Sequence, residues 1–184
     1  MILAELPFAS GGRFQVVRGN LLEEPVDAIV NAANGFLAHG GGVAGLIARA
    51  AGPALTEESE RIVRARGPLP AGSAVVTGAG KLRYKGVIHA VGPRQGEGGE
   101  EAKLRAALGE AFSRAEESGW RSLAFPAVSS GIFAVPLPVC ARAYVAAVRD
   151  WFESGRDGTL RTIRLCLRDQ DVIEAVLAEL GLRP

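Results

Sequence analysis

The strongest constraint on the fold is a regular alternation of strand-like and helix-like segments along the chain. Short apolar runs closed by turn residues predict strands at 13–19, 26–33, 73–80, 86–93, 122–128 and 162–168. Apolar residues at helical spacing predict helices at 42–52, 53–67, 100–118, 136–153 and 172–180. Strands that alternate with helices need crossover connections, so we expect an α/β fold with a largely parallel sheet and helices on both faces.

Length and charge limit the possible function classes. A chain of 184 residues, 48% of them apolar, fits one domain over residues 1–184. The formal net charge of +1 gives no overall electrostatic footprint for nucleic acid, although a local basic patch remains possible. No apolar run is long enough for a membrane span, and the N-terminal segment lacks the basic start of a secretory signal. We therefore expect a cytoplasmic protein without a membrane partner.

The sequence offers few residues for a metal or redox centre. Cys140 and Cys166 both lie in apolar patterns, without the neighbouring Cys or His of a metal site, and are interpreted as buried free thiols. The chain has two histidines, His39 and His89. We predict no metal site and no cofactor.

Two loops stand where an α/β sheet places its ligands, beyond the carboxyl ends of strands and before helix N-termini. One is the stretch "NAANGFLAHGGGVAG" (31–45), and the other is "PAVSSGIFAVP" (126–136). Glycine-rich backbone leaves N–H groups accessible, and successive N–H groups at a helix N-terminus form an anion nest. One predicted nest comprises Gly40, Gly41, Gly42 and Val43, and the other Ser129, Ser130, Gly131, Ile132 and Phe133.

Two facing nests favour a diphosphate over a single phosphate, so a dinucleotide-like ligand is the first candidate. The alternative is that these glycines form plain tight turns. Neither loop is a P-loop, because no Gly-Lys-Ser/Thr follows the glycines, and no G-x-G-x-x-G follows the first strand. The common nucleotide-binding motifs therefore do not explain the loops.

The stretches 19–52 ("GNLLEEPVDAIVNAANGFLAHGGGVAGLIARAAG"), 87–93 ("VIHAVGP") and 123–136 ("LAFPAVSSGIFAVP") together resemble the macro domain, a family that binds ADP-ribose. The resemblance covers nearly the whole chain in the right order. It implies a three-layer α/β/α domain with a central mixed, largely parallel sheet and ADP-ribose in a cleft at the strand ends.

The resemblance also implies roles for single residues. Asn20 stands where the family has an Asp that takes the adenine amino group, so the charge assistance is missing; alternatively Asn20 only closes a turn. Leu21 would present its backbone N–H near adenine, and Asn34 would hold the distal ribose. Asn31 and Asp27 are interpreted as framework residues.

Four further side chains have two interpretations each. His39 either orients the terminal ribose or assists a proton transfer, or it is an exposed loop histidine that does neither. His89 lies inside a strand, and a hydrogen-bonded core imidazole is the preferred interpretation. Phe133 either packs on ribose and phosphates or belongs to the core. Arg168 either stacks on adenine or is a solvated surface arginine.

Binding and hydrolysis are both compatible with these motifs. Hydrolases of one branch of the family carry an Asp just after "GGGV", whereas this chain has Ala44 there. "HGGGVAG" also resembles a viral branch that hydrolyses mono-ADP-ribosyl groups with an alanine at that position. We therefore predict an ADP-ribosyl hydrolase or O-acetyl-ADP-ribose deacetylase, acting through Asn34 and His39, with a non-catalytic ADP-ribose-binding module as the alternative. RNA or poly(A) binding through the same pocket is a third interpretation, which the near-neutral charge disfavours.

Overall fold

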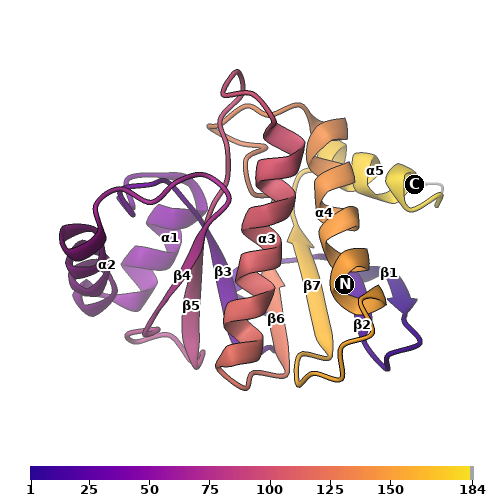
Figure 1. Cartoon of the computed structure of the whole chain (residues 1–184), viewed down its shortest axis with the longest axis horizontal. Helices are drawn as coiled ribbons and strands as arrows, with labels where there is room; N and C mark the ends of the chain where they lie inside the picture. Colours follow the sequence, from indigo (N-terminus) through magenta and orange to yellow (C-terminus); the bar gives the residue numbers. More distant parts are fainter. Residues whose placement is uncertain (183–184) are drawn as a thin grey trace.

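The computed structural model describes residues 1–182; residues 183–184, the end of the predicted domain, lie outside the described part. One seven-stranded sheet has the order β1-β2-β7-β6-β3-β5-β4 (Figure 1). Its strands are β1 (Ile2–Pro7), β2 (Arg13–Arg18), β3 (Ala28–Ala33), β4 (Ala74–Thr77), β5 (Gly86–Val91), β6 (Ser122–Phe125) and β7 (Thr162–Leu167). The helices are α1 (Gly42–Ala51), α2 (Pro53–Arg66), α3 (Glu100–Glu117), α4 (Leu137–Glu153) and α5 (Gln170–Glu179), with one 3-10 turn, η1 (Leu21–Glu23).

The sheet is mixed but largely parallel, as expected. The central strands β2, β7, β6, β3 and β5 run parallel, while β1 pairs antiparallel with β2 and β4 pairs antiparallel with β5. The antiparallel strands are therefore the two edges of the sheet. All parallel strands end on the same side, which places their following loops together.

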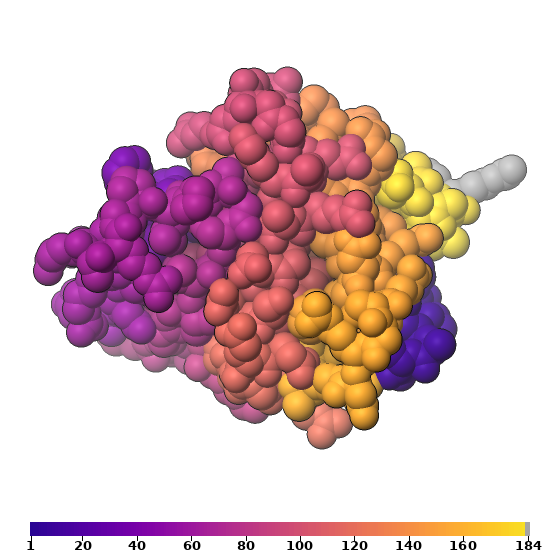
Figure 2. Space-filling model, in the orientation of Figure 1, coloured from indigo at the N-terminus to yellow at the C-terminus, as the bar shows by residue number. Residues whose placement is uncertain are grey.

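Helices cover both faces of the sheet. α3 and α4 pack side by side on one face, with α5 against α4, and α1 packs against β3 on the other (Figure 1). Figure 2 views the face on which α3 and α4 lie, where their side chains cover the middle of the sheet. A large core lies between these helices and the sheet, and a smaller one, which includes Ile29, Ile47 and Tyr84, lies beneath α1. This arrangement confirms the predicted three layers.

Local sequence explains where the first two helices end. Gly52 and Gly67 follow α1 and α2 with φ of +81° and +76°, a region that L side chains rarely adopt. Pro53 occupies the first turn of α2, where its missing N–H costs nothing. The two helices therefore follow one another across a single glycine.

Candidate functional site

A cleft of about 620 Å³ lies at the carboxyl ends of β2, β7, β6 and β3. The loops that follow these four strands supply most of its wall. Its lining residues include Asn20, Leu21, Asn34, Gly40, Gly41, Gly42, Val43, Ala44, Ser129, Ser130, Gly131, Ile132, Phe133 and Arg168. Every residue predicted for ligand binding thus lies on this one cleft.

The loop between β3 and α1 is organised by the side chain of Asn34. Its Oδ1 accepts hydrogen bonds from the backbone N–H groups of Phe36 and Ala38, both at 3.1 Å. Its Nδ2 donates to the Ala38 carbonyl, also at 3.1 Å. A carboxamide suits this position because it accepts and donates at the same time. Asn34 therefore shapes the loop that leads to the glycines, and its side chain borders the cleft.

The glycines end at the N-terminus of α1. Gly42 is the first residue of the helix and has a φ of +56°, so the chain turns sharply there. The N–H groups of the first helical turn have no intrahelical acceptor, and the positive end of the helix dipole adds to their attraction for anions. No side chain caps this helix. These N–H groups are therefore available to a ligand.

The loop between β6 and α4 keeps its hydroxyls turned away from its own amides. Ser129 has a φ of +67°, and its Oγ donates to the Pro93 carbonyl at 2.8 Å. The Ser130 Oγ donates to the Ala127 carbonyl at 2.9 Å. Within residues 1–182 the backbone N–H groups of Gly131, Ile132 and Phe133 have no backbone acceptor. This loop thus presents a second set of free donors.

The two loops approach each other closely. A Cβ built on Gly41 would lie 3.8 Å from the Ile132 Cδ1, and one on Gly42 would lie 4.0 Å from the same atom. Ile132 itself is 79% exposed. Both loops therefore border the same part of the cleft.

Chain topology separates the two ends of the cleft. Asn20 follows β2 and Arg168 follows β7, whereas Asn34 follows β3, with β6 lying between β7 and β3. Neighbouring strands lie about 4.8 Å apart, so an extended ligand could cross all four strand ends over about 14 Å. The β6 loop and the α1 glycines then lie in the middle.

Asn20 caps the 3-10 turn η1. Its Oδ1 accepts a hydrogen bond from the Leu22 N–H at 3.2 Å, and its Nδ2 donates to Glu23 Oε1 at 3.0 Å. The side chain therefore closes this turn, and it also lines the cleft. Arg168 is exposed beside Asp169, the one carboxylate in the lining.

Comparison with known proteins shows the family of this chain. The model of the macro domain family matches residues 30–144. The chain belongs to the macro domain family. An uncharacterised protein of Thermotoga maritima is 48% identical over 163 residues, 88% of this chain, but this match spans only 27% of that protein's length.

Two solved structures share the fold of this macro domain. An Oceanobacillus iheyensis macrodomain with ADP is 25% identical, with a TM-score of 0.87 and coverage of 97% of this chain and 95% of that one. A Trypanosoma brucei macrodomain in complex with ADP-ribose is 30% identical, with a TM-score of 0.81 and coverage of 91% and 69%. Each is a protein to which this chain is similar.

His39 is the one predicted site residue that does not line the cleft of this macro domain. Its Nε2 lies 3.0 Å from the Ser59 Oγ on α2, and Ser59 donates its own proton to the Leu55 carbonyl. The His39 ring therefore donates from Nε2, which leaves Nδ1 as an unprotonated nitrogen without a partner in the described residues. Burial lowers its pKa. This geometry favours a role in holding the loop over one in proton transfer.

His89 is a core histidine, as predicted. Its ring is fully buried, with Nδ1 3.0 Å from Asn31 Nδ2 and Nε2 2.9 Å from Thr77 Oγ1. Burial, with a smaller effect of His39, lowers the pKa of His89 to about 3. A neutral ring that accepts from Asn31 and donates to Thr77 satisfies both nitrogens. Asn31 is thereby confirmed as a framework residue.

The remaining framework predictions also agree with the structure. Asp27 accepts from the Arg121 backbone N–H at 2.8 Å and pairs with Lys85 Nζ at 2.8 Å, outside the cleft. Both cysteines are buried free thiols, and burial raises the pKa of Cys140 to about 11 and of Cys166 to about 12. Cys166 lines the cleft as a protonated thiol at neutral pH, so it adds apolar surface and no nucleophile.

Several lining residues were not predicted. Arg94 borders the cleft with its guanidinium 4.3 Å from the centroid of the Phe133 ring, and the Phe133 carbonyl accepts from the Gln95 N–H. Phe133 therefore belongs to the cleft wall, where Arg94 supports it. Asp169 and Val172, at the start of α5, were also missed. The "VGP" that precedes Arg94 was the available signal, since it ends a strand of the same sheet.

Within residues 1–182, none of the helices combines the length and apolarity that crossing a bilayer requires. The same residues contain no group of three His, Cys, Asp or Glu side chains arranged to hold a metal ion.

Proposed function

We propose that this macro domain binds ADP-ribose, with the diphosphate held between the α1 glycines and the β6–α4 loop. The observation that carries this proposal is the pair of loops with free backbone N–H groups, placed so that a Cβ built on Gly41 would lie 3.8 Å from Ile132 Cδ1. Amides at a helix N-terminus stabilise a diphosphate without cationic side chains. The solved complexes of related macrodomains with ADP and ADP-ribose support the choice of ligand.

We propose one orientation for that ligand, argued from the order of the strands. The end after β2 and β7 is bordered by Leu21, Cys166 and Val172, an apolar surface suited to a base. Asn20 and the exposed Arg168 border the same end and would act on the polar edge and the face of adenine. Asn34, after β3, would hold the distal ribose. The diphosphate would then pass the amides in the middle.

We further propose that this domain hydrolyses ADP-ribosyl esters, in which water and the ester yield ADP-ribose and a free carboxylic acid. The substrates would be mono-ADP-ribosylated acidic side chains or O-acetyl-ADP-ribose. With Ala44 beside the glycines, the ligand's own phosphate would help to orient or deprotonate the water, and the loops would fix the geometry. Well-aligned intramolecular reactions gain about 7–11 kcal/mol from positioning of this kind.

One observation favours a non-catalytic binding module instead. Asp169, the single carboxylate of the lining, follows β7, whereas Asn34 follows β3, so about 10 Å of sheet separates the two positions. No carboxylate of the described lining lies beside the glycines. Such a module would recognise ADP-ribose or an ADP-ribosylated protein without turnover.

One sample tests both functions. Calorimetry with ADP-ribose, ADP, AMP and NAD should give the tightest binding for ADP-ribose, since ADP and AMP lack the distal ribose and NAD carries a bulky nicotinamide on it. A protein auto-modified on acidic residues should then lose its label as free ADP-ribose. Binding with full retention of the label, while a positive-control hydrolase removes it, would establish the binding module. Absence of ADP-ribose binding would refute both.

A further inference from the structure

A second pocket, of about 400 Å³, lies at the opposite end of the sheet from the cleft. It is formed where β2, β6 and β7 begin, and four arginines gather there: Arg13, Arg121, Arg161 and Arg164. The hydroxyl residues Ser122 and Thr162 lie among them. In a chain of net charge +1 this is a local concentration of positive charge.

Strand register brings three of these arginines together. The Arg13 N–H donates to the Arg161 carbonyl at 2.8 Å, and the Arg161 N–H donates to the Arg121 carbonyl at 2.9 Å. Three separate segments of the chain thus start their strands side by side, within two strand spacings, or about 10 Å. The cluster is a product of the sheet, and the sequence alone does not reveal it.

Carboxylates balance only part of this charge. Arg164 is mostly buried, contacts the carboxylate of Glu24 and donates to Gln15 Oε1 at 2.8 Å, so its guanidinium is fixed. Arg161 pairs with Asp157, but that carboxylate is 98% exposed, and such pairs are weak. Arg13 donates to the Thr162 hydroxyl at 3.2 Å. Within residues 1–182, Arg13 and Arg121 form no ion pair, which leaves two guanidinium charges unbalanced.

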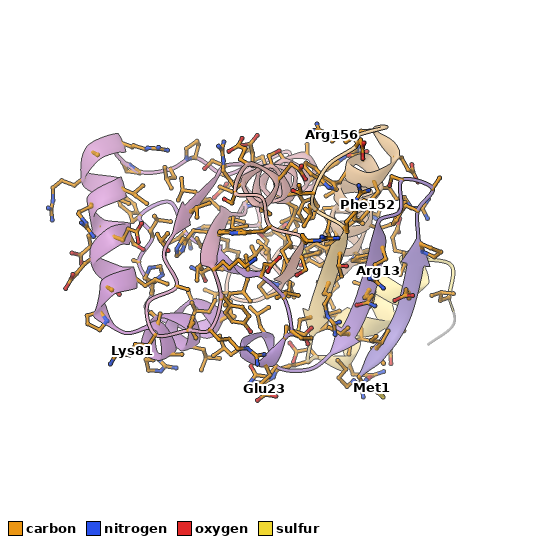
Figure 3. The ribbon with its side chains drawn as sticks, turned by 90° about the horizontal axis from the view of Figure 1, so that it is seen from below. Met1, Arg13, Glu23, Lys81, Phe152 and Arg156 are labelled. Atoms are coloured by element: carbon orange, nitrogen blue, oxygen red, sulfur yellow. The ribbon has the colours of Figure 1, made fainter. Side chains whose placement is uncertain are left out.

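This end of the sheet is open to solvent. Figure 3 views the molecule from below, with Arg13 on β2 and no helix drawn in front of it. Arg13 and Arg121 are both exposed, whereas Ser122 and Thr162, which also line the pocket, are half-buried. A ligand can therefore reach the guanidinium groups directly.

We propose that this pocket is a second anion site, which binds a phosphate group on a small ligand such as pyrophosphate or a phosphate monoester. Guanidinium groups match phosphate oxygens with paired hydrogen bonds, and serine and threonine hydroxyls add neutral donors. No carboxylate is among the lining residues, although Glu24, Asp157 and Asp27 each contact one of the arginine residues from outside the lining. Its volume of about 400 Å³ fits a phosphate group on a small ligand. The site is separate from the cleft, and the inference does not depend on ADP-ribose binding there.

Calorimetry with inorganic pyrophosphate tests this site. Because the cleft could also attract the anion, the parent for the experiment carries Gly41→Glu, which places a carboxylate beside the cleft amides. In that background the double variant Arg13→Gln/Arg121→Gln removes the two unbalanced charges. The matched control is Arg64→Gln/Arg66→Gln on α2. It removes the same charge from exposed arginines that do not line the pocket. Thermal melting verifies that each variant is folded.

The expected result is pyrophosphate binding that weakens at least about tenfold in Arg13→Gln/Arg121→Gln and changes less than about twofold in the control. Absence of binding in the Gly41→Glu parent would overturn the proposal. Equal weakening in both double variants would also overturn it, because the effect would then reflect net charge alone. So would an RNA oligonucleotide that binds through Arg13 and Arg121 where pyrophosphate does not.

Discussion

Ile132 reaches the backbone of Gly41 across the cleft, with its Cδ1 3.8 Å from the position that a Cβ on Gly41 would occupy. The two residues belong to loops that follow β6 and β3, strands that are neighbours in the sheet. Their proximity brings the two loops that carry free N–H groups to the same part of the cleft. A side chain larger than hydrogen at Gly41 would therefore point into the proposed path of the diphosphate.

Gly41→Glu should abolish ADP-ribose binding. The φ of Gly41 is −161°, so the backbone accepts any residue, and the effect comes from the carboxylate placed against the phosphates. Two like charges about 4 Å apart repel by about 4 kcal/mol near a protein surface, so affinity should fall at least about 100-fold by calorimetry. Gly109→Glu is the control, because a Cβ there meets nothing within 4 Å. Undiminished binding in Gly41→Glu would mean that the diphosphate lies elsewhere.

Asn34 should contribute to both stability and binding, and two substitutions separate the effects. Asn34→Ala removes three hydrogen bonds of the loop and should lower the free energy of unfolding by about 1–2 kcal/mol, with at least about tenfold weaker ADP-ribose binding. Asn34→Asp keeps an acceptor for the Phe36 and Ala38 N–H groups but loses the donor. It should remain within about 0.5 kcal/mol of the parent in urea unfolding and still bind weakly. Parental affinity in both variants would contradict a ribose contact.

Most of the central strands and helices were predictable because the spacing of apolar residues reflects which positions are buried. The fully buried β5 and the apolar face of α3 gave clear patterns, and their predicted bounds lie within two residues of the observed ones. β1 was missed, because the edge strand Ile2–Pro7 has only one buried residue, Ala4, and contains Glu5 and Pro7. Its place depends on pairing with β2, a long-range contact that a local pattern does not carry.

The parts of the site that backbone N–H groups form were predictable from the sequence. The parts that side chains form were less predictable. Both loops could be located from their glycine content and from the strand ends they follow. Backbone N–H groups at a helix N-terminus are accessible to a ligand only where no side chain covers them. The direction of His39 was not predictable, since its partner Ser59 lies on the next helix, 20 residues further along the chain. Arg94 and the cluster around Arg121 depend in the same way on which segments the sheet brings together.

Asn20→Asp should strengthen ADP-ribose binding when the charge of the neighbouring Glu23 is removed as well. A carboxylate is a stronger acceptor for an adenine amino group and keeps the cap on the Leu22 N–H. Glu23 now accepts from the Asn20 amide and would repel the new carboxylate, so the test uses Asn20→Asp/Glu23→Gln with Glu23→Gln as its control. Calorimetry should show about a three- to tenfold gain over that control. Equal affinity would mean that adenine does not contact this side chain.

Stability should fall as the pH falls below about 6.5, because His89 is neutral in the folded protein. Its pKa is about 3 when folded, against 6.5 when exposed, so the unfolded chain binds more protons between these values. The stabilisation is complete above pH 6.5 and is lost as the pH falls toward 3. The slope approaches about 1.4 kcal/mol per pH unit, which gives about 2 kcal/mol between pH 6.5 and 4.5. Burial lowers the pKa of His39 as well, so part of the slope belongs to that ring.

His89→Gln isolates the contribution of the buried ring. This variant keeps a side chain able to donate and accept near Asn31 and Thr77 but has nothing to titrate in this range. Urea unfolding at several pH values between 4.5 and 7 should give a flatter dependence than in the parent, whatever the absolute stability of the variant. Asp27 and Glu116, whose pKa values are lowered, contribute to the slope at the acidic edge of this window, but they contribute equally in the parent and in His89→Gln. An unchanged slope in His89→Gln would show that the folded protein tolerates a charged His89.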